Sequence, residues 1–556
     1  MNLKNVNDRM SQIGIKLESA AKLEGGKIKS PQETFKIGLK SLESLSPPID
    51  FKIVEIHNHD FLDIPVHQVR SKLISNGKGL NEDFSKASAI MEFVERYSWD
   101  YFISHQQENM IFASMDELGN IGFSEGYFIN NLADSATVKN NFSKIRKIKM
   151  RWVKAYSISK NRFIWYPLSW HNAVNSSNGL ASGNSFTEAI VQAICETVER
   201  HTYSRIAFSN RTLPTIKVDC SRWSRAANLI EKFELGGLSL VLKNMTNEIK
   251  IPSVLALAPD NCSPAVNNAC GMGTHINPED AVIRAITECA QVRAQMLDIK
   301  SHFAVPKTFD EYFEKMQKKA CAIFNTNEFY ERMDKNSEIV ESSQIEALQS
   351  NDILSDLKLL ISLLEKESHE IFVVNKTHPK LSIPTVRIFI PTLKYYVLTS
   401  DIPVSLDSIL ARIYLDTADI DNAIIYLQKT GHEFFLEMAD ILQKLKKSGI
   451  SNQECIAKLG ENLKTKMVDK KAKYRLSEAI VITENPRYEQ ISLFNSKSGL
   501  HAKIRTVAFN YLKMLEEKPL EEVLMGNQNL EEFDEDKFLV FIEKLLMKGF
   551  LGFVNN

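Results

Sequence analysis

Three segments of the chain repeat one short pattern that places an acid in an otherwise apolar helix. The copies are Ala89-Ile90-Met91-Glu92, Ala193-Ile194-Cys195-Glu196 and Ala285-Ile286-Thr287-Glu288. The first two copies continue alike and add Glu95-Arg96 and Glu199-Arg200. Because residues three or four positions apart share one face of a helix, each Glu pair projects to one side while aliphatic side chains cover the other.

Carboxylates that cluster beside buried aliphatic side chains are costly unless a cation compensates them. Magnesium prefers hard oxygen ligands, so a divalent metal that carries a polyphosphate suits this arrangement. The alternative is that each Glu lies on a solvated helix face, with Arg96 and Arg200 as intrahelical ion-pair partners. Two near-identical copies and a third partial copy favour the metal site. The long, unequal intervals between copies indicate one pseudo-symmetric domain.

Glycine-rich segments precede all three acidic helices. They are Gly77-Lys78-Gly79, residues 176–184 and Gly271-Met272-Gly273. We interpret them as turns that free backbone N–H groups at a helix start, where phosphate binds well. None matches a Walker A motif or a dinucleotide fingerprint, and ordinary turns are the alternative.

Four basic residues near these segments are predicted to neutralise phosphate oxygens: Lys27, Lys78, Arg200 and Arg284. Arg284 and Glu288 are one helical turn apart, so both can face the same ligand. An ion pair between Arg284 and Glu288 is the alternative.

The elements that position these residues alternate between helix and strand up to about residue 395. Ser30-Pro31-Gln32-Glu33 has the form of a capping box that begins a helix. The acidic helices are predicted over 85–105, 185–207 and 278–297, with strands at positions that include 162–167 and 386–390. This order predicts an α+β or α/β domain.

The C-terminal part changes to almost continuous helix from about residue 402. Residues 411–424 have the small-aromatic spacing of a tetratricopeptide-like (TPR-like) hairpin, but a single copy is equally compatible with a plain helical hairpin. We predict helices over 402–470 and over 471–556, the latter winged-helix-like, with Gly549-Phe550-Leu551-Gly552-Phe553 closing a small wing.

Composition excludes several classes of function. The 556 residues indicate two or three domains, and the net charge of −1 gives no reason to expect nucleic acid or an anionic membrane as partner. The seven cysteines contain no CxxC pair, which argues against a disulfide framework or a zinc site, and Cys195 and Cys289 are predicted to be packing residues. No signal peptide or membrane-spanning run is evident, so we expect a cytoplasmic protein. The histidines of His57-Asn58-His59-Asp60 are expected in a surface loop.

In combination, these motifs resemble the YcaO family. They are the glycine-rich segments, the repeated Glu-x-x-Glu-Arg, the Glu188, Gln192, Glu196 and Glu199 ladder, and Gly-x-Gly-x-His followed by Arg284 and Glu288. The resemblance covers roughly residues 20–395. It implies an α+β fold with a YcaO-type ATP-binding domain over 1–395, a motif core at 70–300 and an all-α C-terminal region.

The resemblance also implies cofactors and site residues. The cofactors are ATP and Mg²⁺, and the metal ligands carried over by position are Glu92, Glu95, Glu196 and Glu199. Residues that would contact the nucleotide or the metal are Lys27, Lys78, Ser88, Asn184, Glu188, Arg200, Arg284 and Glu288. No general base is identifiable from these motifs.

YcaO enzymes use ATP to activate a peptide-backbone amide oxygen, which a nucleophile then replaces. A Cys, Ser or Thr side chain gives an azoline, sulfide gives a thioamide and an amine gives an amidine. No peptide-binding domain is fused ahead of the domain and no proline-rich tail ends the chain, and both features count against azoline formation. The segment around Pro31 resembles archaeal-type members that work with a TfuA partner in thioamidation. The helical C-terminal part is similar to stand-alone bacterial members, some linked to ribosomal-protein methylthiolation.

The sequence therefore predicts an ATP-dependent enzyme of the cyclodehydratase or thioamide-forming type. Its expected partners are a peptide or protein substrate, a TfuA-like or peptide-recognition protein and a second copy of the chain, without nucleic acid or membrane. Two alternatives remain: a nucleotide-binding scaffold that assists another modifying enzyme, and an ATP-dependent ligase or kinase for a small molecule.

Overall fold

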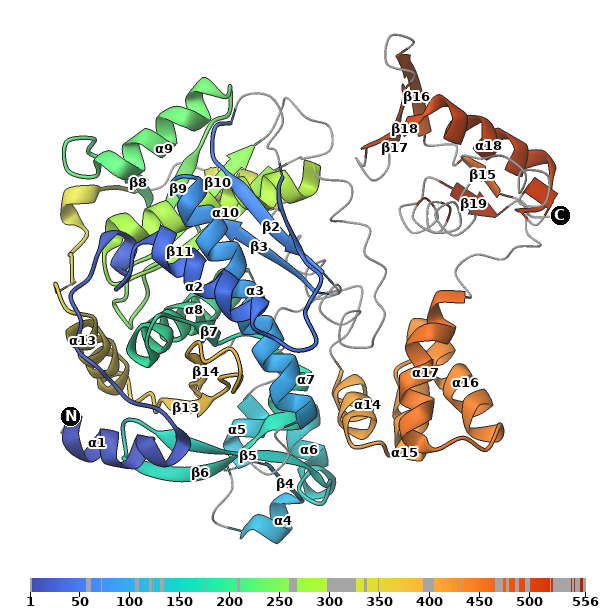
Figure 1. Cartoon of the computed structure of the whole chain (residues 1–556), viewed down its shortest axis with the longest axis horizontal. Coiled ribbons are helices and arrows are strands. Elements are labelled where there is room, and N and C mark those ends of the chain that lie inside the picture. The colour runs from blue at the N-terminus through green and yellow to red at the C-terminus, as the bar shows by residue number, and fades with distance from the viewer. Residues whose placement is uncertain are drawn as a thin grey trace. The chain divides into compact units, whose positions relative to one another are not determined.

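The structure is a computed structural model in which most of the chain can be described. The described residues are 3–56, 62–71, 73–105, 110–119, 123, 125–130, 135–175, 177–207, 211–259, 268–297, 327–334, 338–348, 350–393, 405–431, 433–465, 474–476, 480–485, 490–495, 501–520, 522–523, 542, 545 and 551–553. They form two compact units (Figure 1), of which the first holds the three acidic helices and runs to Leu436. The segment 57–60 lies outside the described residues.

Within the described residues, the first unit contains three sheets. One is antiparallel and consists of β1 (Lys52–Glu55), β2 (Val66–Arg70) and β3 (Ile74–Lys78). The second has the order β11 (Asn268–Thr274), β10 (Ser253–Pro259), β9 (Val241–Asn244), β8 (Thr215–Lys217) and β12 (Ile339–Glu341). The third has the order β4 (Met110–Ala113), β5 (Met150–Ser157), β13 (Phe372–Asn375), β14 (Thr385–Phe389) and β7 (Leu180–Ser182), with β6 (Arg162–Pro167) also paired to β5. The strands predicted at 162–167 and 386–390 are thus confirmed.

The three acidic helices are also confirmed. They are α3 (Glu82–His105), α8 (Phe186–Ala207) and α10 (Pro278–Leu297). The helix predicted to begin after Ser30 is α2 (Pro31–Glu43), and its capping box is present: the Ser30 hydroxyl accepts from Glu33 N–H while the Glu33 carboxylate accepts from Ser30 N–H.

Glycines let each acidic helix lie directly on a strand. A Cβ at Gly77 in β3 would lie 2.0 Å from the carbonyl oxygen of Ser85 in α3. A Cβ at Gly273 in β11 would lie 2.1 Å from the Ala281 oxygen in α10, and one at Gly183, just after β7, 2.6 Å from the Ala189 nitrogen in α8. Every one of these separations is too short for a real Cβ, so a larger residue would push helix and strand apart.

This arrangement corrects our prediction for two of the glycine-rich segments. Gly77 and Gly273 lie in strands, where their role is close helix packing, and not in turns that open a helix. The segment before α8 does contain a turn, with Gly179 at φ 80°.

Other helices complete the first unit. They are α1 (Leu3–Met10), α4 (Met115–Leu118), α5 (Glu125–Asn130), α6 (Ser135–Ile145), α7 (Leu168–Asn175), α9 (Ser224–Leu235), α12 (Asn327–Asp334) and α13 (Ile353–Lys366). One hydrophobic cluster joins α8 and α13 to one face of β13 and β14, and another joins α5, α6 and α7 to the opposite face.

The helical C-terminal region is confirmed from 405 to 465. It comprises α14 (Leu406–Asp416), α15 (Ile420–Lys429), α16 (Glu433–Lys447) and α17 (Asn452–Thr465). The first two form a hairpin in which Tyr414 stacks on Tyr426 with ring centroids 5.4 Å apart. Apolar residues of α14 complete the cluster around α7: Leu406, Ile409, Leu410 and Ile413. The two helices therefore pack with the first unit, and the TPR-like assignment stays a prediction.

The prediction that residues 471–556 are helical is wrong for the described residues between 474 and 505, which form strands. The winged-helix-like assignment stays a prediction. Strands β16 (Ile480–Asn485), β17 (Gln490–Asn495) and β18 (His501–Arg505) form an antiparallel sheet, followed by α18 (Thr506–Glu517). Alternation such as Ile480-Val481-Ile482-Thr483, rich in β-branched residues, explains the strands. The predicted C-terminal wing corresponds to β19 (Leu551–Phe553), which pairs with β15 (Tyr474–Leu476). No helix among the described residues is long and apolar enough to cross a membrane.

Candidate active site

The acidic helices bring together glutamates that are about a hundred residues apart in the sequence. The charge of Glu196 in α8 acts on Glu95 in α3, and the charge of Glu288 in α10 acts on Glu199 in α8. Glu92 and Glu95 share one face of α3, as the spacing predicts. The three copies of the motif therefore face one common site.

Burial and like charge act together on Glu95 and Glu196. Burial, followed by the charges of Glu196 and Glu92, raises the pKa of Glu95 well above its usual range. Burial raises the pKa of Glu196 to about 7, with Glu199 adding to the effect and Arg200 opposing it. Glu95 and Glu196 also accept hydrogen bonds from the backbone N–H groups of Ser182 and Gly179, which lower their pKa values. At Glu95 and Glu196 the effect of burial therefore outweighs these backbone donors and the nearby arginines.

Glu92 has partners of its own. The backbone N–H of Asn76 in β3 donates to Glu92 Oε2 at 3.0 Å, and Arg96 Nε donates to Glu92 Oε1 at 2.9 Å. For Arg96 the intrahelical ion pair considered as an alternative is thus present. The corresponding distances from Arg200 are longer, 3.9 Å to Glu196 and 3.7 Å to Glu199.

Lys78 links the first motif to the third. It forms an ion pair with Glu288, and both side chains are mostly buried. Burial by itself would raise the pKa of Glu288, but the Lys78 and Arg200 charges and a bond from Met272 N–H leave it lowered. Among the described residues, Arg284 makes no ion pair with Glu288. Its charge acts instead on Glu199 and Lys27.

A third group of predicted residues surrounds Glu188, which is 3% exposed. Asn184 donates to Glu188 Oε1 from its backbone N at 3.3 Å and from Nδ2 at 3.1 Å. The backbone N–H of Ile28 donates to Glu188 Oε2 at 3.0 Å, and Lys27 Nζ lies 3.6 Å from Oε1. Lys27, Asn184 and Glu188 are therefore neighbours. Burial lowers the pKa of Lys27, and Glu188 opposes this effect.

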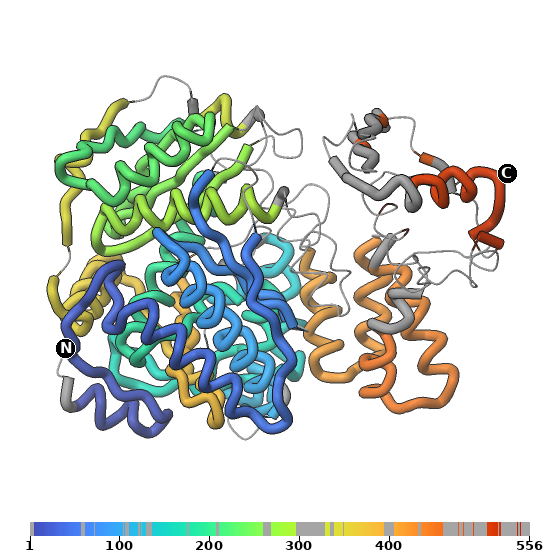
Figure 2. The backbone as a smooth tube through the Cα atoms, turned by 45° about the horizontal axis from the view of Figure 1, so that its top comes forward, coloured from blue at the N-terminus to red at the C-terminus, as the bar shows by residue number. Residues whose placement is uncertain are grey.

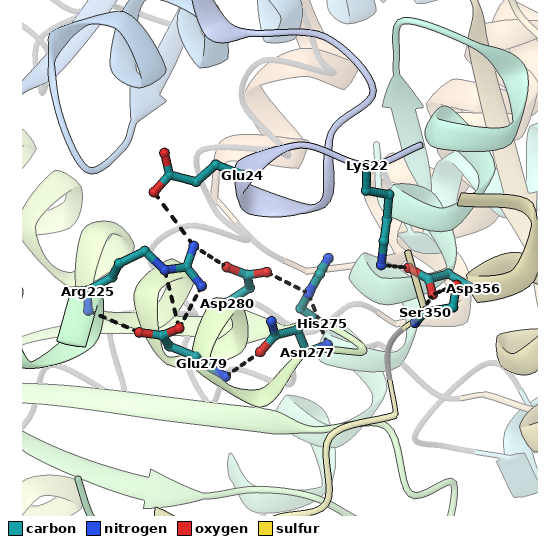
Figure 3. A network of polar contacts seen from close by, with 9 residues as sticks. All are labelled: Lys22, Glu24, Arg225, His275, Asn277, Glu279, Asp280, Ser350 and Asp356. Atoms are coloured by element: carbon teal, nitrogen blue, oxygen red, sulfur yellow. Dashed lines mark hydrogen bonds and ion pairs between the residues drawn. The ribbon is translucent and has the colours of Figure 1, made fainter. Parts of the chain in front are cut away.

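The residues 15–30, which we call the N-terminal strap, lie beside α8 (dark blue in Figure 2). Glu18 N–H donates to Thr187 Oγ1 at 2.8 Å, and Thr187 Oγ1 donates back to the Glu18 carbonyl at 3.0 Å. Further along the strap, Lys22 forms a buried ion pair with Asp356, whose Oδ1 accepts from the Ser350 backbone and hydroxyl (Figure 3).

Arg225 of α9 anchors the strap from the other side. Its guanidinium lies 3.8 Å from Glu24, 2.7 Å from Glu279 and 3.0 Å from Asp280, and Asp280 lies 3.6 Å from His275 (Figure 3). Burial, together with the Arg284 and Lys22 charges, holds the pKa of His275 well below its usual range.

Sequence reasoning missed most of this network. His275 belonged to the Gly-x-Gly-x-His motif, but Lys22 and Asp356 are 334 residues apart and carry no local signal.

Ser88 is the predicted site residue with the least structural support. It is half-buried, and its side chain makes no hydrogen bond within the described part of the chain. The nearby Ser85 is fully buried, donates to the Gly77 carbonyl at 3.0 Å and lies 2.9 Å from His67 Nδ1. The assignment of Ser88 stays a prediction. Cys195 and Cys289 are buried, as predicted for packing residues, and burial raises the pKa of Cys195 to about 12.

The donor set fits magnesium bound together with phosphate. Within the described residues, no three His, Cys, Asp or Glu side chains are grouped closely enough to hold a metal ion by themselves. Magnesium usually binds one or two carboxylates and completes its shell with water and substrate phosphates. Half-buried Glu95 and Glu196, with their raised pKa values, and the basic residues Lys78 and Arg284 match that requirement.

A family model described as "YcaO cyclodehydratase, ATP- and Mg2+-binding" matches residues 76–394. An uncharacterized protein of Methanothermobacter thermautotrophicus is 28% identical over 62% of this chain and 90% of the relative. A Rhizobium leguminosarum protein described as lying in the tfuA 3' region is 37% identical over 21% of this chain and 30% of the relative. The Escherichia coli ribosomal protein S12 methylthiotransferase accessory factor YcaO is 23% identical over 57% of this chain and 56% of its own length.

Two solved structures share the fold. A heterocyclase in complex with substrate and cofactor has a TM-score of 0.55 at 20% identity and covers 69% of this chain and 55% of that chain. YcaO from Methanopyrus kandleri, bound with AMPPCP and Mg²⁺, has a TM-score of 0.50 at 20% identity and covers 67% and 94%.

Proposed function

This chain belongs to the YcaO family, and from that premise we propose that it uses ATP and Mg²⁺ to activate a peptide-backbone amide for post-translational modification. The observation that carries the proposal is the convergence of Glu95, Glu196 and Glu199, whose pKa values are raised by burial and by like charge. Such a site is stable in its charged form only when cations are bound.

Every predicted site residue except Ser88 has a role in this proposal. Glu92, Glu95, Glu196 and Glu199 would hold Mg²⁺, and Lys78, Arg200 and Arg284 would orient the phosphates. Glu288 would contact the nucleotide or the metal. Glu188 and Asn184 hold the N-terminal strap, which places Lys27 at the same site. Bound Mg²⁺·ATP supplies the phosphoryl group that turns the amide oxygen into a leaving group.

Among the possible products we propose a thioamide, with azoline formation as the alternative. The relationship to the Rhizobium protein described from the tfuA 3' region supports a TfuA-like partner. Mass spectrometry of a peptide treated with ATP and sulfide would separate the two products. A thioamide gains a sulfur atom in exchange for the amide oxygen, whereas an azoline forms by loss of water and takes up no sulfur.

The name of the Escherichia coli relative, an accessory factor, favours a second candidate: a nucleotide-binding scaffold that assists another modifying enzyme. Both candidates need the same ligands for ATP. They differ in turnover, because a scaffold is not expected to hydrolyse ATP faster when a substrate peptide is added.

Calorimetric titration of Mg²⁺·ATP into the full chain tests the shared premise. We expect binding that depends on Mg²⁺ in the wild type and its loss in the Glu92→Gln/Glu196→Gln variant. The matched control is Glu82→Gln/Glu231→Gln, which removes two exposed carboxylates from α3 and α9 and should bind as the wild type does. A folded wild type that does not bind Mg²⁺·ATP would contradict the proposal for the isolated chain.

A further inference from the structure

A pair of buried cations lies on the sheet next to the glutamates. Lys376 directly follows β13 and Arg387 lies in β14, and the side chains of both are fully buried. In the antiparallel register Val374 pairs with Arg387, and the Lys376 N–H continues the ladder by donating to Thr385 O at 2.8 Å. Because Lys376 is two residues from Val374, Lys376 and Arg387 lie on the same face of the sheet.

Aromatic rings form the walls around this pair. Lys376 Nζ lies 3.2 Å from the centroid of Phe102 and 4.9 Å from that of Trp99. The Arg387 guanidinium lies 4.3 Å from the Trp99 centroid and also donates to Asn172 Oδ1 at 3.2 Å. Arg387 thus has a polar partner, whereas Lys376 Nζ has no hydrogen-bond acceptor in the described part of the chain.

The buried cations are connected to the candidate active site. Glu95, Trp99 and Phe102 follow each other at helical spacing on α3, so one stripe of the helix carries both a proposed metal ligand and the aromatic walls. The charge of Arg387 lowers the pKa of Glu196, which places Arg387 within electrostatic range of the metal site.

A buried lysine side chain without an acceptor requires an explanation. Lys376 and Arg387 repel each other, and burial and that repulsion lower the pKa of Lys376 well below its usual range. His171 also faces the pair. Two more fully buried donors, Trp170 Nε1 and Ser98 Oγ, lack acceptors among the described residues. A bound acceptor that carries negative charge would give Lys376 Nζ a partner and relieve the repulsion, while water would do only the former.

We propose that Lys376 and Arg387 form a binding site for a small, weakly hydrated monoanion. The aromatic walls and the few donors suit an anion that is cheap to dehydrate, and they do not suit phosphate, which needs several N–H donors. Hydrosulfide and halides share this chemistry. The choice among these anions rests on the proposed function, because hydrosulfide is the one that the reaction would consume.

The chemistry then balances without an oxidant or reductant. Sulfur of HS⁻ bonds to the carbon of the phosphorylated amide, and the C–O bond breaks with its electron pair leaving on phosphate. The S–H proton passes to that phosphate, which departs as hydrogen phosphate, and the amide N–H is kept. The product is a thioamide.

Thermal unfolding of the full chain in sodium bromide, hydrosulfide and fluoride at equal ionic strength tests the site. The quantity compared is the Tm of the wild type minus the Tm of Lys376→Met. We expect this difference to rise by ~2–4 °C and then saturate as bromide or hydrosulfide is added. It should not change with fluoride, which is strongly hydrated. The control is Lys154→Met, because Lys154 is exposed but its Nζ also lies over a ring, 4.4 Å from the Phe163 centroid. Its Tm difference from wild type should not depend on the anion.

A second measurement does not require Lys376→Met to fold. Bromide quenches tryptophan fluorescence. The quenching of the wild type should therefore contain a component that saturates with bromide concentration, and this component should be absent from Trp99→Phe.

Equal anion dependence in wild type and Lys376→Met, or no saturable quenching, would overturn the proposal and leave water at these donors. A response to bromide but not to hydrosulfide would overturn the nucleophile assignment. Mg²⁺·ATP titration of Lys376→Met is run in parallel. The wild type is titrated in the same way. Failure of the wild type to bind Mg²⁺·ATP would count against the proposed function and not against the anion site.

Discussion

At the scale of residues, the environment of each glutamate differs although the motifs are nearly identical. Glu92 is neutralised by Arg96, Glu288 by Lys78, and Glu188 is surrounded by donors from Asn184 and Ile28. Glu95 and Glu196 have less compensation, and burial dominates their pKa values. These two carboxylates are therefore the ones whose charged forms depend most on a bound cation.

This difference predicts an unusual dependence of stability on pH in metal-free buffer. The pKa of Glu196 is about 7 in the folded protein against 4.5 for an ordinary Glu. Between these values the folded protein keeps a proton that the unfolded chain has released. The free energy of unfolding should therefore fall as pH rises from about 4.5 to about 7, by up to roughly 3 kcal/mol from Glu196, and then level off.

Urea unfolding at pH 5 and pH 8 in the presence of a chelator measures this effect. Glu196→Gln stays neutral and should show a smaller loss of stability between the two pH values than wild type. Glu231→Gln removes an exposed carboxylate of α9 and should behave like wild type. An unchanged pH dependence in Glu196→Gln would mean that the pKa of Glu196 is not raised.

At the scale of elements, close contact between strand and helix aligns the three motifs. Gly77 in β3 faces the backbone of α3 at Ser85 and Ala89. Gly273 in β11 faces the backbone of α10 at the equivalent positions of its motif, Ala281 and Ala285. The same contact recurs at Gly183 and α8. Since each acidic helix is set against its strand in this way, the glutamates of three separate segments can reach one site.

The contact predicts a strong effect of a single methyl group. Gly77→Ala would place a Cβ 2.0 Å from the Ser85 oxygen and 2.3 Å from the Ala89 nitrogen, both backbone atoms that cannot rotate away. We expect a loss of about 1–3 kcal/mol or more in the free energy of unfolding, and weaker Mg²⁺·ATP binding because α3 shifts. Urea unfolding and calorimetry measure the two effects.

Gly236→Ala is the control, because the nearest atom would be 3.3 Å from its Cβ and its φ is −73°. It should cost much less stability than Gly77→Ala. Equal stability of Gly77→Ala and wild type would show that β3 and α3 are not in such close contact.

At the scale of the whole molecule, the boundary of the first unit lies beyond the predicted domain end at 395. Helix α14 supplies Leu406, Ile409, Leu410 and Ile413 to the cluster that includes Trp152 and Trp170. The α14–α15 hairpin is therefore part of the core of the first unit.

Two truncated chains test this conclusion. A chain that ends at residue 431, after α15, should unfold cooperatively and bind Mg²⁺·ATP, whereas one that ends at 395 should be less stable by several kcal/mol, because four buried aliphatic side chains are lost from one cluster. Circular dichroism during urea unfolding compares them. Equal stability of the two fragments would show that α14 adds nothing to this core.

The sequence by itself determined the features that depend on neighbours along the chain. Helical spacing identified α3, α8 and α10 and their acidic faces, the capping box identified the start of α2, and the motifs together identified the family. These signals are local because hydrogen bonds and side-chain contacts in a helix join residues three or four positions apart.

Only the tertiary structure decided the rest. It showed that Gly77 and Gly273 lie in strands. The need for a small residue there arises because a helix that comes later in the sequence packs directly on the strand. It joined Lys78 to Glu288 and Lys22 to Asp356, contacts across 210 and 334 residues that no local pattern encodes. It also placed Lys376 and Arg387 side by side in the interior. The register of two strands sets their separation, and that register cannot be read from two isolated basic residues in a sequence.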